Sequence, residues 1–325
     1  MFPLPRNQTL ILAISGGPDS IFLLDKIAQV QNRNNLKIII AHLNHQIRGT
    51  ESDKDELFVI KTAKKYQIPF EVKKINVPEY AKKYKLNLEQ AARNARYAFL
   101  SEIAEKNSAK YILTAHHQDD NIETVLFKFF RGCNLKSLTG MSQKQNISVI
   151  YNEKIYHANI LRPLLNTQKK EILDYLRKNK IKFCIDKSNF DTKLKRNFLR
   201  HNLIPQIEQI NPEFNKKFPK TIENFSLIEN FIQQEIKKWL KLNFKKSSFP
   251  MDLFNLLHPY IRQEIIKNLF YKFSPHEELS STHIQNILDL INKKKSNTKK
   301  EFGKKHFLKI LNKKVCIISI AIHQK

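Results

Sequence analysis

Residues 10–20 read LILAISGGPDS, and this stretch constrains the fold more than any other part of the chain. Five unbroken apolar residues, 10–14, are typical of a strand buried on both faces of a sheet. An apolar pattern at helical spacing resumes after Ser20, so the polar turn joins a buried parallel strand to a helix. Ligands of open α/β sheets collect at such junctions, outside the carboxyl ends of the strands.

The turn has the chemistry of a phosphate cradle, and it comprises Ser15, Gly16, Gly17, Pro18, Asp19 and Ser20. Two glycines let the backbone bend sharply and approach a ligand, and successive N–H groups at a helix N-terminus favour an anion. It is not the P-loop of nucleoside triphosphatases, because no Gly-Lys-Ser/Thr follows and no lysine of the loop reaches the phosphates. A carboxylate beside phosphates requires a cation between them, so Asp19 indicates either bound Mg²⁺ or a simple helix cap.

The net charge of +27 suits a polyanionic partner, and nucleic acid is the first candidate. The alternative is a drift in composition, since the chain is rich in Lys, Asn, Ile and Phe and has only 6 glycines. We expect both effects, so the sign of the charge supports RNA while its size is discounted.

Other features of the composition bound the class of protein. No apolar run approaches the ~20 residues of a membrane helix, and the start MFPLPRNQTL lacks the features of a signal peptide. Cys133, Cys184 and Cys316 are far apart and odd in number, which argues against a disulfide framework. We therefore expect a cytoplasmic protein that does not enter a membrane.

The order of the elements predicts an α/β fold with a doubly wound, mostly parallel, Rossmann-like sheet. Strands are expected at residues 10–14, 37–43, 70–75 and 110–115, a hairpin at 147–160, and helices after Ser20 and at 55–66, 87–106, 119–131 and 169–179. After a turn at 186–191 and a short basic helix at 196–205, the pattern changes to helices at 211–242, 259–273 and 281–293 and a β-like tail at 307–322. We therefore divide the chain into an α/β domain, 1–210, which the resemblance below identifies as the catalytic one, and a basic, mainly helical domain, 211–325.

Two pairs of polar residues follow the strand at 110–115. His116 and His117 have no third ligand at zinc spacing, so a phosphate or base contact is favoured over a metal site. Asp120 and Glu123 are three residues apart and share one face of the next helix, where the two carboxylates could act together. The alternative for acids at a helix start, Asp119 included, is that they only complement the helix dipole.

Two pairs of arginines are candidates for anion binding. Arg93 and Arg96 project from one face of the helix at 87–106, and solvated surface charge is the alternative. Arg196 and Arg200 lie one turn apart and suit RNA phosphate or the nucleotide, with surface charge again the alternative for Arg200.

Five stretches together resemble the tRNA(Ile)-lysidine synthetase family of PP-loop ATP pyrophosphatases: SGGPDS (15–20), NHQIRGTES (44–52), AARNARYAFL (91–100), TAHHQDDNIET (114–124) and DKSNFDTKLKRNFLRHNLIP (186–205). The resemblance implies a ligase that uses ATP to adenylate carbon 2 of the wobble cytidine in tRNA(Ile) with anticodon CAU, releasing pyrophosphate. Free L-lysine then displaces AMP and forms lysidine, and we expect Asp120 and Glu123 to select this lysine. Longer members carry a further terminal β-rich domain, which we expect to be absent here.

The resemblance also implies site residues. Those that bind ATP are Ser15, Gly16, Gly17, Pro18, Asp19, Ser20, Arg93 and Arg96, with Asp19 as the Mg²⁺ ligand; those with catalytic roles are Asp19, His116, Asp120, Glu123 and Arg196. The second domain is expected to bind tRNA, and a homodimer is compatible with the family. The alternative is another PP-loop tRNA-modifying enzyme such as a thiolase, which would depend on cysteine pairs that these scattered cysteines do not offer. An ammonia-dependent amidating synthetase and an inactive RNA-binding relative are further alternatives.

Overall fold

The computed structural model describes residues 4–185, 195–275, 277–292 and 299–319. The chain divides into two compact units, unit 1 (Met1–Phe225) and unit 2 (Ser226–Lys325). None of the helices in the described ranges is both long enough and apolar enough to cross a membrane.

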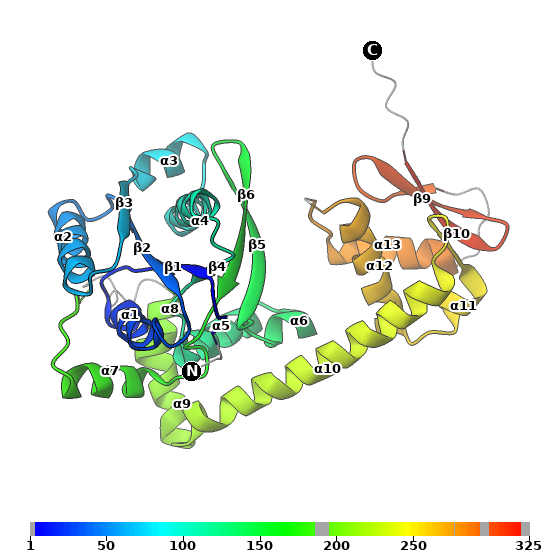
Figure 1. Ribbon diagram of the computed structural model, residues 1–325. Coiled ribbons are helices and arrows are strands. Elements are labelled where there is room, and N and C mark those ends of the chain that lie inside the picture. Colours follow the sequence, from blue (N-terminus) through cyan, green and yellow to red (C-terminus); the bar gives the residue numbers. More distant parts are fainter. Residues whose placement is uncertain (1–3, 186–194, 276, 293–298, 320–325) are drawn as a thin grey trace, which may run out of the picture. The chain divides into compact units, whose positions relative to one another are not determined.

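The described part of unit 1 contains a six-stranded sheet in the order β3-β2-β1-β4-β6-β5 (Figure 1). The strands are β1 (Thr9–Ala13), β2 (Lys37–Asn44), β3 (Phe70–Lys74), β4 (Tyr111–Leu113), β5 (Lys144–Tyr151) and β6 (Lys154–Leu161). All neighbouring pairs are parallel except β5 and β6, which form the predicted hairpin at the edge. The predicted mostly parallel sheet is therefore confirmed.

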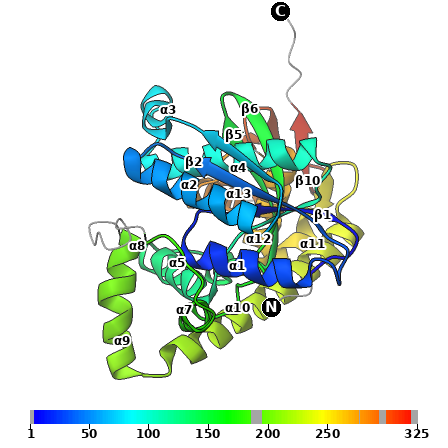
Figure 2. The same ribbon diagram turned by 60° about the vertical axis from the view of Figure 1, so that its left-hand side comes forward.

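Alternating side chains of β1 face two different apolar cores. Leu10 and Leu12 pack with α1 (Pro18–Val30), α2 (Thr50–Lys65) and α7 (Lys169–Lys178), and α1 and α2 cover this face in Figure 2. Ile11 packs on the other face with α3 (Val77–Lys83) and α4 (Leu88–Lys106). β1 lies between β2 and β4 in the interior of the sheet. Its carboxyl end and the turn that follows therefore lie in the middle of the sheet edge.

A smaller apolar cluster packs α5 (Gln118–Phe130) against the helical segment that begins at Lys195. Ile122 and Leu126 of α5 pack against Leu199 and Ile204. These two come from the π-helical segment η2 (Leu199–Leu203) and from α9 (Ile204–Ile210), which continue α8 (Lys195–Phe198). The predicted basic helix at 196–205 is thus part of a longer helical run, while the predicted turn at 186–191 lies outside the described residues. The short helix α6 (Leu135–Leu138) was not predicted.

Unit 2 is built from helices and a small sheet around a core that includes Trp239, Phe249 and Phe254. Its elements are α10 (Phe214–Asn243), which begins in unit 1, α11 (Met251–Asn255), α12 (Pro259–Phe273), α13 (Ser281–Asn292), β7 (Ser248–Pro250), β8 (Lys299–Glu301), β9 (His306–Leu311) and β10 (Lys314–Ser319). The four strands form an antiparallel sheet in the order β7-β10-β9-β8. The β-like tail corresponds to β9 and β10; β7 and β8 were not predicted. The predicted boundary at 210 falls between α9 and α10, whereas the compact units divide at Phe225 within α10.

Candidate functional site

The turn between β1 and α1 depends on glycine at one position. Gly16 has a φ of +92°, a conformation that strains any residue with a side chain, and its carbonyl accepts the Cys184 N–H at 2.9 Å. A Cβ at Gly16 would lie 3.4 Å from Cys184 Sγ, an ordinary contact. The backbone conformation, rather than a lack of space, therefore requires glycine here. Gly17 is the N-cap of α1, and Pro18 follows at its first position.

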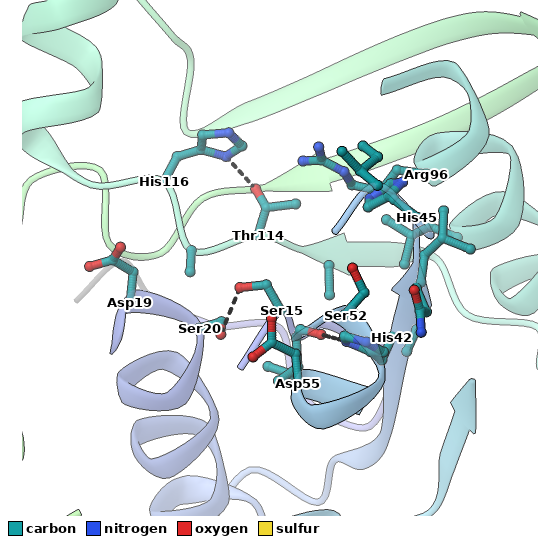
Figure 3. Close-up of a pocket in the computed structure, with 18 of the residues that line it drawn as sticks. Ser15, Asp19, Ser20, His42, His45, Ser52, Asp55, Arg96, Thr114 and His116 are labelled. Atoms are coloured by element: carbon teal, nitrogen blue, oxygen red, sulfur yellow. Dashed lines mark hydrogen bonds between the residues drawn. The ribbon is translucent and has the colours of Figure 1, made fainter. Parts of the chain in front are cut away.

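Two serines brace the turn from inside. The Ser15 hydroxyl donates to Ser20 Oγ at 3.2 Å, and the Ser20 hydroxyl donates to the Gly17 carbonyl at 2.9 Å. The Gly17 N–H donates to Ser15 Oγ at 3.3 Å. The hydroxyls thus hold the shape of the anion cradle predicted at residues 15–20, and Figure 3 shows them facing each other beside Asp19.

A cavity of about 460 Å³ opens at the carboxyl ends of β1, β2 and β4. Of the residues predicted for the site, its lining includes Ser15, Asp19, Ser20, Arg96, His116 and Asp120. Figure 3 labels all of these except Asp120. The volume is within the range of small-molecule sites. Residues of β2 and of the segment that follows it also line this cavity. Segments from four parts of the chain therefore converge on one pocket.

Neutral histidines form part of the pocket wall. Nδ1 of the buried His42 donates to the Ile14 carbonyl at 2.8 Å, which leaves Nε2 as an acceptor without a hydrogen-bond partner among the described residues. Burial lowers the pKa of His42, and burial together with the charge of Arg96 lowers the pKa of His45 to about 3. Neither histidine was predicted as a site residue from the sequence, although His45 lies in one of the five matching stretches.

His116 is also neutral near pH 7. Its Nδ1 lies 2.9 Å from Thr114 Oγ1. Burial and the charges of Arg162 and Arg96 lower its pKa to about 4, outweighing the opposite effect of Asp120. A neutral imidazole can donate or accept a hydrogen bond but cannot neutralise phosphate. Among the described residues, no three or more His, Cys, Asp or Glu side chains form a metal-binding group.

The two arginines of α4 are separated by the fold. Arg96 lines the pocket, and burial and the charge of Arg93 lower its pKa. The Arg93 guanidinium lies 4.7 Å from the centre of the Tyr97 ring and lines a different hollow, beside β5. The two arginines are three residues apart on one helix, but only Arg96 lines the pocket.

Asp19 belongs to a charged cluster at the start of α5, whose members are Asp19, His117, Asp119, Asp120, Glu123, Lys169 and Arg200. Lys169 Nζ lies 2.6 Å from Asp19 Oδ1, and the Lys169 backbone N–H donates to Asp119 at 3.0 Å. The buried His117 ring lies 3.7 Å from Asp19 and 3.4 Å from Asp120. Burial alone lowers the pKa of His117, but the surrounding carboxylates outweigh burial and raise it.

Arg200 donates hydrogen bonds to Glu123 and Asp120, the two acids predicted to select lysine. It contacts the two oxygens of Glu123 at 2.6 and 3.0 Å and Asp120 at 3.1 Å. Burial raises the pKa of Glu123 despite this partner. Arg196 is different, because its half-exposed side chain lies 3.6 Å from the exposed Glu89. The structure thus places Arg200, the weaker candidate from sequence, at the acidic end of α5.

A second cavity of about 230 Å³ lies on the other side of this charged cluster. Its lining includes Asp119, Glu123, Lys169, Arg200 and Glu208. Glu208 accepts a hydrogen bond from Asn215 at 2.6 Å and has no ion-pair partner among the described residues. The charged cluster therefore separates two polar cavities, one beside the cradle and one rich in carboxylates.

The fold and the pocket define a nucleotide-binding class of α/β protein, with an anion cradle at the central strand of a parallel sheet. Residues 3–207 match the PP-loop domain family, which is more than half of the 325-residue chain. The chain belongs to the PP-loop family.

Curated relatives match beyond this domain. The chain is 39% identical over 231 residues to the tRNA(Ile)-lysidine synthase of Thermosipho africanus, covering 71% of this chain and 51% of the relative. It is 33% identical over 294 residues to the synthase of a Bacillus cereus strain (88% and 60%) and 34% identical over 292 residues to that of Bacillus subtilis (87% and 60%). The chain thus spans about half to three fifths of the length of these relatives.

A solved structure supports the fold alone. The U34-tRNA thiolase NcsA from Methanococcus maripaludis, with its [4Fe-4S] cluster, aligns with a TM-score of 0.54 at 16% identity, covering 68% of this chain and 73% of that one.

Proposed function

We propose that this chain catalyses the tRNA(Ile)-lysidine synthase reaction, in which lysine is joined to the wobble cytidine of tRNA(Ile) with anticodon CAU. The observation that carries the proposal is the pair of cavities on the two sides of the charged cluster. The reaction needs a nucleotide and a small amine close together, and identity to relatives named for this reaction extends over most of the chain.

The first cavity suits ATP. Its phosphates would lie on the backbone N–H groups of the turn at residues 15–20, Pro18 excepted, with Arg96 and the neutral His116 facing the base being modified. In the first step the cytosine oxygen attacks the α-phosphorus, and the bond to the β-phosphate breaks so that pyrophosphate leaves with the electron pair. Arg93 remains a weaker candidate, since it lines a different hollow.

Mg²⁺ fits the oxygens present in the cradle. The Asp19 carboxylate and the hydroxyls of Ser15 and Ser20 are the ligands that Mg²⁺ prefers, and this ion keeps its remaining sites for water and substrate phosphates. When bound, it would neutralise charge on the phosphates. We therefore retain Asp19 as the proposed metal ligand.

The second cavity suits lysine, although not in the way that sequence spacing indicated. Arg200 already bonds Asp120 and Glu123, so these acids act by holding its guanidinium, which would receive the α-carboxylate of lysine. Glu208, with no ion-pair partner among the described residues, would receive the α-ammonium. The neutral ε-amine then attacks carbon 2 of the base, and the bond from this carbon to the AMP oxygen breaks.

Unit 2 is proposed to supply tRNA affinity. The chain carries a net charge of +27, and Lys299 and Lys300 are exposed on the short strand β8 of this unit. Such an enzyme would act in the cytoplasm.

One incubation tests the proposal. The protein, ATP, Mg²⁺, bulk tRNA and labelled lysine should yield AMP, pyrophosphate and labelled tRNA, and omission of tRNA should abolish all three. Transfer of sulfur rather than lysine to tRNA would favour a thiolase, and ATP cleavage that depends on ammonia would favour an amidating synthetase. Binding of tRNA without any ATP cleavage would indicate an inactive RNA-binding relative.

A further inference from the structure

Lys169 is the one residue of the charged cluster that no sequence motif indicated, and it comes from a distant part of the chain. Its ammonium reaches Asp19 at 2.6 Å although the two residues are 150 positions apart. Its backbone N–H is fixed on Asp119 at 3.0 Å. The side chain is 30% exposed, so the ammonium can move while its anchor stays in place.

Helix α7, which begins at Lys169, is fastened to the helix behind the cradle. The Tyr175 hydroxyl donates to the buried Asp25 carboxylate at 2.7 Å, and the hydroxyl of Tyr66, the residue that follows α2, donates to its other oxygen at 2.7 Å. The rings of Phe22 and Tyr175 meet edge to face at 5.1 Å. These contacts hold α7 against α1, the helix that begins at the cradle.

The cradle itself contains no cationic side chain, because residues 15–20 read SGGPDS. We propose that Lys169 supplies the missing phosphate-binding lysine, a role that rests on the proposed function. When ATP binds, the ammonium exchanges the Asp19 carboxylate for oxygens of the β- and γ-phosphates. As the bond between the α-phosphorus and the bridging oxygen breaks, Lys169 stays protonated and stabilises the negative charge that develops on pyrophosphate.

The other basic side chains of the cluster are less suited to this role. Arg200 is held by three hydrogen bonds to Glu123 and Asp120, and His117 is almost completely buried. Exchange at Lys169 has little cost, since one charge-assisted contact replaces another. It also frees the Asp19 carboxylate, the proposed metal ligand.

Equilibrium binding of ATP, pyrophosphate and AMP, without tRNA or lysine, tests the proposal. Lys169→Met should bind ATP and pyrophosphate roughly ten- to a hundredfold more weakly, the range for a lost charged hydrogen bond, and AMP within about twofold. Lys170→Met is the matched control, because Lys170 is the exposed neighbour and the charge change is identical. Lys169→Arg should retain most of the affinity, and far-UV circular dichroism checks that each variant is folded.

A second pair of variants separates phosphate binding from simple neutralisation of Asp19. If Lys169 only neutralises Asp19, adding Asp19→Asn to Lys169→Met should restore ATP binding and thereby overturn the proposal. Equal weakening of AMP and ATP, or a raised lysine requirement with normal ATP binding, would also overturn it. An unmodified protein that binds neither ATP nor pyrophosphate would contradict the proposed function itself.

Discussion

The contact between Arg200 and Glu123 offers a quantitative test of the charged cluster. Glu123 is 4% exposed and receives two of the hydrogen bonds of Arg200, so Arg200→Met leaves a carboxylate buried without its cation. Breaking a buried pair costs about 3–5 kcal/mol. Because the Arg200 side chain is 34% exposed and water screens it, we expect a smaller loss of about 2–3 kcal/mol in unfolding free energy.

The double variant shows whether this loss arises from the stranded charge. Glu123→Gln removes the buried charge. The loss of unfolding free energy in the double variant Arg200→Met, Glu123→Gln should therefore be smaller than the sum of the two single losses by roughly 1–2 kcal/mol. The sign of the pH dependence follows from the pKa of Glu123, which burial already raises and which loss of Arg200 raises further. The folded variant then binds this proton more readily than the unfolded chain, so the deficit of Arg200→Met should shrink as the pH falls from 7 toward 5.

The assay must resolve the two units, because a chain with two units need not unfold in one step. Trp239 is the single tryptophan and packs in the core of unit 2, so its fluorescence follows that unit. Amide hydrogen exchange of α5 follows unit 1. Arg200→Met should lower the protection of α5 and leave the fluorescence transition of Trp239 in place. Strictly additive losses, or a deficit that is independent of pH, would refute the reasoning.

Three further predictions concern other parts of the molecule. The pKa values of His42 and His116 are lowered in the folded chain, the latter to about 4, so the unfolded chain binds these protons first as the pH falls. The unfolding free energy of unit 1 should therefore decrease between about pH 6.5 and 4, and a denaturant series that shows an increase there contradicts this. Asp19→Asn should remain folded and lose tRNA-dependent pyrophosphate release, and full release by the folded variant would exclude a required metal contact. Replacing Lys299 and Lys300 by Glu should weaken tRNA binding and flatten its decrease with salt, whereas ATP binding stays unchanged; unaltered tRNA affinity would count against β8 as a contact surface.

Much of unit 1 could be predicted because its signals are local. The run at residues 10–14 and the turn that follows specify β1 and the start of α1 within a few positions. Unit 2 was harder, since β7 and β8 each have three residues and form only because β10 and β9 offer backbone partners. Short strands of this kind carry too little pattern to be recognised before the partners are known.

The charged cluster shows the same limit at the candidate site. Asp19 and Asp120 were identifiable from motifs, but the pairing of Asp19 with Lys169 depends on packing of α7 against α1. The sequence analysis favoured Arg196 over Arg200, and only the packing of η2 on α5 brings Arg200 to Glu123. Sequence spacing thus identified the charges, while tertiary contacts determined which of them meet.

The most direct test of the central claim is analysis of the nucleosides of a single tRNA. An isoleucine tRNA transcript with anticodon CAU, incubated with the full chain, ATP, Mg²⁺ and lysine, is digested and its nucleosides are separated by mass. We predict that the wobble cytidine is converted to lysidine and that a transcript with uridine at this position stays unmodified. An unchanged cytidine after incubation with protein that binds both ATP and this tRNA would contradict the proposed function.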